Sequence, residues 1–190
     1  MQIKTEATIE DLYNAPDDGK YELVNGKLVK MSPTGYRPGR VAFLIADALL
    51  AYEERTGAGE ALSDGVAYIV NLPHRRSFSP DASYTFDIPA EDREMKFIDG
   101  IPIFAVEVRS EHDYGPRSDQ EYRDKRADYF AVGTKIVWDV DPVRRTVYSY
   151  HRDDPSAPTI FNEDMANAEP ALPGWTIAVA DLFVRRRRRV

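Results

Sequence analysis

Three ionisable side chains in this sequence are of the types that can hold a divalent cation and stabilise negative charge beside it. Glu107 lies within the apolar run at 103–108, where a carboxylate loses hydration and therefore needs a cationic partner. Asp81 follows Pro80 directly before the run 82–86, so a turn fixed by proline would present its carboxylate at the end of a strand. Two carboxylates on neighbouring strands suit Mg²⁺, with Mn²⁺ as a substitute, because this cation takes one or two carboxylates together with water and a substrate phosphate.

The third side chain is Lys125, whose spacing is more informative than its type. Tyr122, Lys125, Tyr129 and Val132 are separated by three, four and three residues, which places them on one face of a helix. A lysine on the face that packs against a sheet can lay its methylene groups over apolar neighbours and extend its ammonium toward Glu107.

Each of these residues also has an ordinary structural interpretation. Glu107 could lie near a sheet edge and point to water or to a structural arginine. Pro80-Asp81 could form a surface turn, and a helical lysine is most often solvated at the margin of an apolar stripe. Only the combination of the three favours a functional site.

The composition limits which chemistry is available. The 190 residues include no cysteine and three histidines, which excludes disulfides, thiolate zinc sites and cysteine nucleophiles, so a metal must be held by oxygen. The formal charge of −7 becomes −12 when the five arginines at 185–189 are left out. An acidic body argues against a protein that coats nucleic acid through a basic surface, but it does not exclude a nuclease, because carboxylates that hold a cation count as negative.

The chain fits one domain at 1–184, followed by a basic tail at 185–190 that either clamps a phosphate backbone or is simply solvated. Its longest apolar stretches, such as 41–50 with Asp47 inside it, fall short of the ~20 residues that cross a bilayer. The first residues lack the apolar core of a signal peptide. We therefore expect a soluble, cytoplasmic protein with no membrane partner.

Local patterns predict the elements that would position these side chains. Thr8 and Asp11 predict a capped helix, and Asn25-Gly26 between 21–24 and 27–31 predicts a hairpin with a type I′ turn. Apolar spacing predicts a helix over 40–53 that ends at Gly57, and a capping box of Ser118 and Glu121 predicts a second helix over 118–132. Strands are predicted at 66–70, 82–86, 101–108, 135–140 and 145–150, the last two joined by the turn at 141–142.

This order of elements predicts an α/β fold with a mixed central sheet and helices on both of its faces. The strand at 101–108, the helix at 118–132 and the strand at 135–140 would form a crossover unit with parallel strands.

The motifs that carry these residues resemble those of one family. They are Pro80-Asp81, the run 107–110 (EVRS), Lys125 with Tyr129 four residues later, and the run 137–142 (VWDVDP). Together with the runs 21–28 (YELVNGKL) and 31–33 (MSP), their order and spacing resemble the Uma-two family of restriction-endonuclease-like proteins, over roughly residues 8–183.

The resemblance implies a PD-(D/E)XK nuclease with a restriction-endonuclease-like sheet, an N-terminal helix and hairpin, and a catalytic lysine moved from the strand to the following helix, here Lys125. It also implies Glu22 as an additional acid and a homodimer. Arg109 stands where the parent motif has its lysine, and it could bind a phosphate but could not accept a proton. Arg40, at the start of the helix where many relatives carry a histidine, is a second candidate for substrate binding. Pro38 in the same segment marks a lost substrate contact.

The sequence thus predicts a magnesium-dependent endonuclease that hydrolyses phosphodiester bonds in DNA. Asp81, Glu107 and the carbonyl of Val108 would hold the ion, and Lys125 would orient the attacking water. A protein that keeps the nuclease fold but only binds nucleic acid or acts as a scaffold is the main alternative. Hydrolysis of another phosphate ester, such as a nucleotide or an RNA end, is a third.

Overall fold

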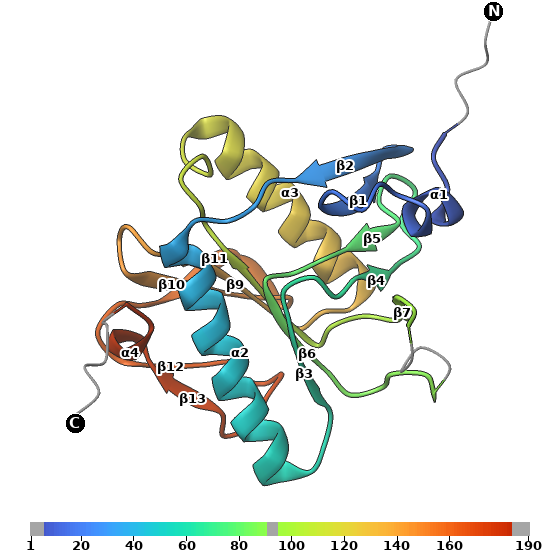
Figure 1. Cartoon of the computed structure of the whole chain (residues 1–190). Helices are drawn as coiled ribbons and strands as arrows, with labels where there is room; N and C mark the ends of the chain where they lie inside the picture. Colours follow the sequence, from blue (N-terminus) through green and yellow to red (C-terminus); the bar gives the residue numbers. More distant parts are fainter. Residues whose placement is uncertain (1–5, 91–94, 184–190) are drawn as a thin grey trace, which may run out of the picture.

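The computed structural model describes residues 6–90 and 95–183 (Figure 1). The basic tail at 185–190 lies outside the described residues. The centre is a six-stranded mixed sheet with the order β11-β10-β9-β8-β6-β3, in which only β8 and β9 run parallel. Its strands are β3 (Glu60–Ser63), β6 (Ala82–Thr85), β8 (Phe104–Val108), β9 (Ile136–Asp141), β10 (Thr146–His151) and β11 (Asp154–Phe161).

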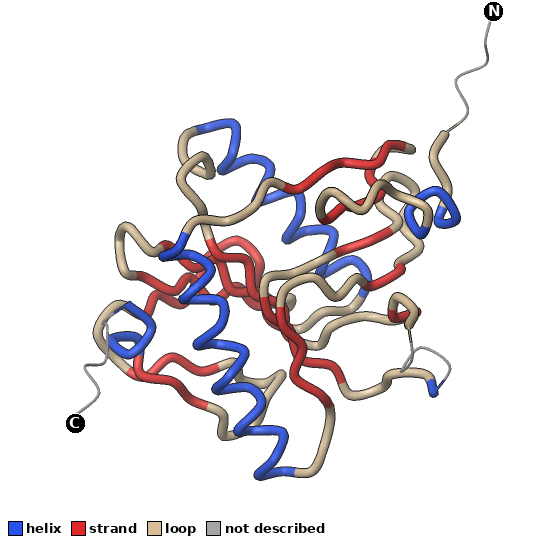
Figure 2. The backbone as a smooth tube through the Cα atoms, viewed as in Figure 1, coloured by secondary structure: helices blue, strands red, loops and turns tan. Residues whose placement is uncertain are grey.

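One long helix covers each face of this sheet (Figures 1 and 2). Helix α2 (Tyr36–Thr56) packs on the larger apolar cluster, which includes Phe104 and Trp138. Helix α3 (Pro116–Val132) joins β8 to β9 and packs through Tyr129 on a smaller cluster that includes Ala105 and Val137. The α/β prediction and the crossover unit are both confirmed.

The N-terminal elements lie outside the central sheet. Helix α1 (Ile9–Tyr13) has the predicted capping box of Thr8 and Asp11, and β1 (Lys20–Val24) pairs with β2 (Lys27–Met31). Asn25 and Gly26 between them have φ values of +51° and +63°, as a type I′ turn requires. The segment 74–76 attaches this hairpin to the rest of the fold. The Asn25 N–H donates to the His74 carbonyl, the Arg76 N–H donates to the Leu23 carbonyl, and Val24 forms a β-bridge with Arg75.

Smaller elements complete the layers. Strands β5 (Ser77–Phe78), β4 (Tyr68–Ile69) and β7 (Ile98–Asp99) form a three-stranded sheet beside the hairpin. Strands β12 (Met165–Asn167) and β13 (Thr176–Ala178), with helix α4 (Val179–Phe183), extend the core on the α2 side.

The ends of the two long helices differ from the sequence prediction. Helix α2 begins at Tyr36 rather than residue 40, because Pro38 lies in the first turn, where backbone N–H groups need no helical partner. The predicted capping box of Ser118 is wrong. Helix α3 starts at Pro116 after Gly115, and the Ser118 hydroxyl donates to the carbonyl of His112 instead. The strand predicted from residue 101 begins only at Phe104.

Candidate active site

Glu107 lies on β8, a central strand bonded on one side to β6 and on the other to β9. Alternation along the strand turns Phe104, Val106 and Val108 toward α2 and Glu107 toward α3. Its carboxylate accepts a hydrogen bond of 2.7 Å from the Tyr129 hydroxyl and forms an ion pair with the Lys125 ammonium. The alternative of a solvated carboxylate at a sheet edge is therefore excluded.

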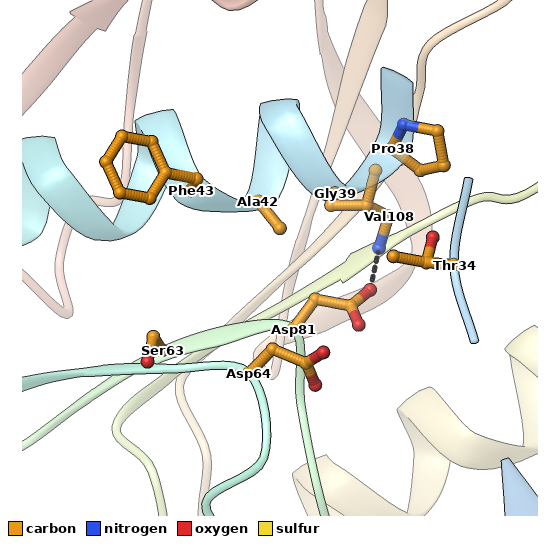
Figure 3. Close-up of a pocket in the computed structure, with 9 residues that line it drawn as sticks. All are labelled: Thr34, Pro38, Gly39, Ala42, Phe43, Ser63, Asp64, Asp81 and Val108. Carbon is orange, nitrogen blue, oxygen red and sulfur yellow. Dashed lines mark hydrogen bonds between the residues drawn. The ribbon is translucent and has the colours of Figure 1, made fainter. Parts of the chain in front are cut away.

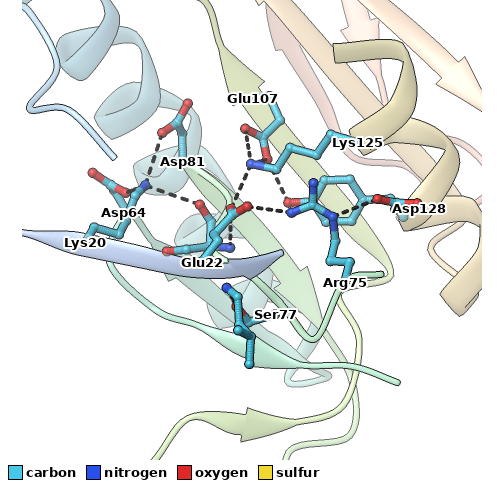
Figure 4. A network of polar contacts seen from close by, with 12 residues as sticks. Lys20, Glu22, Asp64, Arg75, Ser77, Asp81, Glu107, Lys125 and Asp128 are labelled. Atoms are coloured by element: carbon cyan, nitrogen blue, oxygen red, sulfur yellow. Dashed lines mark hydrogen bonds and ion pairs between the residues drawn. The ribbon is translucent and has the colours of Figure 1, made fainter. Parts of the chain in front are cut away.

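Lys125 lies on the buried face of α3, with its side chain 15% exposed (Figure 4). Its Nζ is 2.8 Å from Glu107 Oε1 and 3.0 Å from Glu22 Oε1. Burial alone would lower the pKa of the ammonium, but the two carboxylates outweigh it and raise the pKa above the usual value. Lys125 is thus a protonated, fixed charge between two acids.

Asp81 lies just before β6, where its N–H donates to the Val106 carbonyl and its Oδ2 accepts from the Val108 N–H at 2.7 Å. Burial and then the charge of Glu107 raise the pKa of Asp81 to about 7, against the smaller opposing effects of Lys20 and the Val108 N–H. Because the two carboxylates repel each other, a cation bound between them would stabilise the ionised form of Asp81.

Glu22 comes from the separate N-terminal hairpin and is almost fully buried. Its Oε1 accepts from the Ser79 N–H at 3.0 Å, and its Oε2 accepts from Arg75 at 2.6 Å. Burial alone would raise the pKa of Glu22, but the charges of Lys125 and Arg75 hold it below its usual value. The structure thus places Glu22, Glu107 and Lys125 in direct contact and Asp81 beside them.

Sequence reasoning missed Arg75, which joins the hairpin to helix α3. Its guanidinium binds Glu22 on β1 and, through Nε at 2.7 Å, Asp128 on α3, three residues after Lys125. Arg75 lies in the turn between β4 and β5, where no periodic pattern distinguishes it from its neighbour Arg76. Lys20, the first residue of β1, was also missed; its Nζ is 2.5 Å from Asp64 and 3.8 Å from Asp81.

Replacing Arg75 with methionine is expected to lower the free energy of unfolding by about 3 kcal/mol or more, because Glu22 and Asp128 would stay buried without their common cation. Urea denaturation measures this change. Arg76→Met is the matched control: Arg76 is exposed, and its side chain donates a hydrogen bond of 3.2 Å to the Val70 carbonyl but binds no carboxylate among the described residues. Equal losses in the two variants would show that the buried network does not hold the hairpin.

The two arginines predicted to bind substrate lie in different surroundings. Arg109 makes a bidentate pair with Asp139, both bonds at 2.8 Å, and a further pair with Asp119 at 2.6 Å. These partners raise its pKa and commit its donors to holding the start of α3 against β9. Arg40 is exposed on α2, with its guanidinium 5.2 Å from the centre of the Phe43 ring. Of the two arginines, Arg40 therefore has more guanidinium N–H groups available to a substrate phosphate.

The donor set beside Asp81 fits a hard divalent cation. No group of three or more acidic or histidine side chains lies close enough within residues 6–90 and 95–183 to form a closed metal cage. The charge of Glu107 acts on Asp81, and Asp64, Asp81 and Val108 line a pocket of about 170 Å³, which Glu107 itself does not line (Figure 3). A carboxylate of raised pKa that faces open space matches the preference of Mg²⁺ for few protein ligands and several waters or phosphate oxygens.

The raised pKa of Asp81 predicts how cation binding depends on pH. A cation and a proton compete for this carboxylate, so below about pH 7 apparent affinity should rise roughly tenfold per pH unit and then level off. Isothermal titration with Mn²⁺ from acidic to mildly alkaline pH tests this. An affinity that is flat across pH 6 to 7 would contradict it.

Comparison with known proteins agrees with this geometry. Residues 7–180 match the model of the Uma2 family, described as "Putative restriction endonuclease". The chain belongs to the Uma2 family. A crystal structure described as "a putative nuclease belonging to DUF820", from Anabaena variabilis ATCC 29413, superposes with a TM-score of 0.72 at 17% identity, covering 93% of this chain and 97% of that one. A comparison with curated proteins finds no match.

The family and the fold together indicate that this Uma2 protein is a restriction-endonuclease-like nuclease. None of its described helices has the length and apolar character needed to span a bilayer.

Proposed function

We propose that this Uma2 protein is a magnesium-dependent endonuclease that hydrolyses phosphodiester bonds in DNA. The observation that carries the proposal is the direct pair of Glu107 and Lys125, with Asp81 near enough for the charge of Glu107 to raise its pKa. A buried ammonium held by two carboxylates must be desolvated, which apolar residues in the same place would not require, and the raised pKa of Asp81 shows that its charge is unfavourable there. Perturbed groups of this kind gather at catalytic sites.

Each residue has a distinct role in the proposed reaction. Asp81, Glu107 and the carbonyl of Val108 would hold the cation, which when bound supplies a Lewis acid for the phosphoryl oxygens and lowers the pKa of water. Lys125 is protonated, so it orients the attacking water by hydrogen bonding and offsets negative charge in the transition state rather than removing a proton. Glu22 and Tyr129 hold Lys125 and Glu107 in place.

Titration with Mg²⁺ or Mn²⁺, paired with a DNA cleavage assay, tests this function. Wild-type protein should bind the cation and cut DNA, and chelation should stop cutting. Glu107→Gln should lose cation binding and at least a hundredfold in cleavage rate. Glu121→Gln, an exposed glutamate on α3, is the matched control and should behave as wild type. Undiminished cleavage by Glu107→Gln would remove the proposal.

One observation favours the alternative of an inactive, nucleic-acid-binding or scaffold protein. The ammonium of Lys125 already neutralises Glu107, and Lys20 lies 3.8 Å from Asp81, so the carboxylates have internal cations. Under this alternative, nucleic acid would bind equally well with and without divalent ions and would not be cut. The same titration and cleavage assay separates the two functions.

The homodimer expected from the resemblance stays a prediction. The outer strands of the central sheet, β3 and β11, offer backbone groups at its two edges, and pairing of an edge with a second copy would give two sites for two DNA strands. Light scattering tests this directly.

A further inference from the structure

The pocket beside Asp81 has a composition that the proposed catalysis does not explain. Pro38, Ala42 and Phe43 of α2 form one side of it, and Ser63, Asp64 and Asp81 form the other (Figure 3). One end is therefore acidic and belongs to the proposed cation site. The other end is apolar and carries no basic side chain, so it does not suit a phosphate.

Phe43 is the most exposed part of this apolar end. Its side chain lies on α2 and the residue is 56% exposed, although it borders a pocket with room for a flat ring. An exposed aromatic face next to a nuclease centre is what base stacking uses, since every nucleobase has a π-face. The Arg40 guanidinium lies over one face of the ring, 5.2 Å from its centre, and this side chain makes no ion pair or hydrogen bond among the described residues. Its guanidinium is therefore available to a phosphate next to a stacked base.

Gly39 lets Thr34 approach the helical wall of the pocket closely. A Cβ built on this residue would lie 3.1 Å from Cγ2 of Thr34, which also lines the pocket. A side chain at residue 39 would therefore push against Thr34, so glycine preserves the shape of this wall.

The net charge of the protein also favours recognition of a base over a long contact with phosphates. Without the tail arginines the formal charge is −12, which disfavours a long footprint on a phosphate backbone. Recognition of a base by stacking needs few phosphate contacts.

We infer that this pocket holds a single unpaired nucleobase, stacked on Phe43, next to the phosphate that is cut. The inference rests on the proposed function and deepens it by naming the substrate class: single-stranded DNA or DNA with an unpaired nucleotide. Intact duplex must first lose the stacking and pairing of one base, so it binds more weakly.

A binding scan with abasic DNA tests the inference independently of catalysis. The probes are a short labelled single-stranded DNA, its duplex, and single-stranded versions that lack one base at each position in turn, all measured with Ca²⁺. Wild type should prefer the single strand to the duplex by about tenfold, and one abasic position should weaken binding by a similar factor. Phe43→Ala should lose both effects.

Two further variants separate stacking from a general loss of structure. Leu50→Ala, on the same helix and 46% exposed but outside the pocket, should bind as wild type. Gly39→Ala should weaken single-strand binding while the protein stays folded by circular dichroism, because its Cβ would push against Thr34 at the wall of the pocket. Equal binding by Phe43→Ala and Leu50→Ala, equal affinity for the duplex and the single strand, or no binding of any probe would overturn the inference. Base-dependent binding without cleavage in Mg²⁺ would uphold it and refute the endonuclease instead.

Discussion

Replacing Asp81 with asparagine is expected to stabilise the protein above pH 7 and to abolish cleavage. The asparagine oxygen can still accept from the Val108 N–H, but it carries no charge in a buried place beside Glu107. An acid whose pKa is raised from 3.8 to about 7 by folding loses stability as pH rises between these values. The variant avoids this loss, so its free energy of unfolding at pH 8 should be higher by an amount on the order of 2 kcal/mol.

Opposite changes in stability and activity would identify Asp81 as functional rather than structural. Cleavage should fall by a hundredfold or more, because one of the two carboxylate ligands is gone. Asp47→Asn is the control: Asp47 is exposed on α2, and its replacement should change stability by less than about 0.5 kcal/mol and leave cleavage alone. If Asp81→Asn were less stable than wild type at pH 8, the charge of Asp81 would be structural, held by Lys20 at 3.8 Å, and this prediction would be wrong.

Replacing Lys125 with methionine should reduce both activity and stability. Cleavage should fall at least a hundredfold through the loss of transition-state stabilisation. Glu107 and Glu22 would lose the ammonium they share, so the free energy of unfolding should fall by about 3 to 5 kcal/mol. Denaturation and single-turnover cleavage measure the two losses.

A double variant separates these two effects. Glu22→Gln combined with Lys125→Met removes one of the two buried carboxylates that lost the ammonium and should recover part of the stability, while cleavage stays lost. Recovery of cleavage along with stability would contradict a direct role of Lys125 in the reaction.

Local signals predicted the parts of the site that lie on regular elements. Glu107 is conspicuous because a carboxylate interrupts an apolar strand, and Lys125 because it falls on the stripe that continues to Tyr129. Both side chains lie where these patterns predict, on the faces of β8 and α3 that meet each other.

The contacts that hold the site together were not predictable because they join segments far apart in the sequence. Arg75 reaches Glu22, 53 residues away, from a turn whose sequence has no periodic pattern. Arg109 was expected to face a substrate, and its pairs with Asp139 and Asp119 depend on how β9 and α3 lie around it. Such tertiary contacts leave no trace in local propensity.

The helix starts show a similar limit. Ser118 and Glu121 have the spacing of a capping box, yet α3 starts two residues earlier at Pro116, because the fixed φ of proline already suits a first turn. Two local signals competed here, and proline set the start of the helix.

A crystal of the protein soaked in Mn²⁺ provides the most direct measurement, through the anomalous scattering of the ion. We expect one strong anomalous peak within bonding distance of carboxylate oxygens of both Asp81 and Glu107, with the Lys125 ammonium beside it. A peak elsewhere, or unchanged contacts of Glu107 with Lys125 and of Asp81 with Val108 and no bound ion at saturating Mn²⁺, would contradict the account.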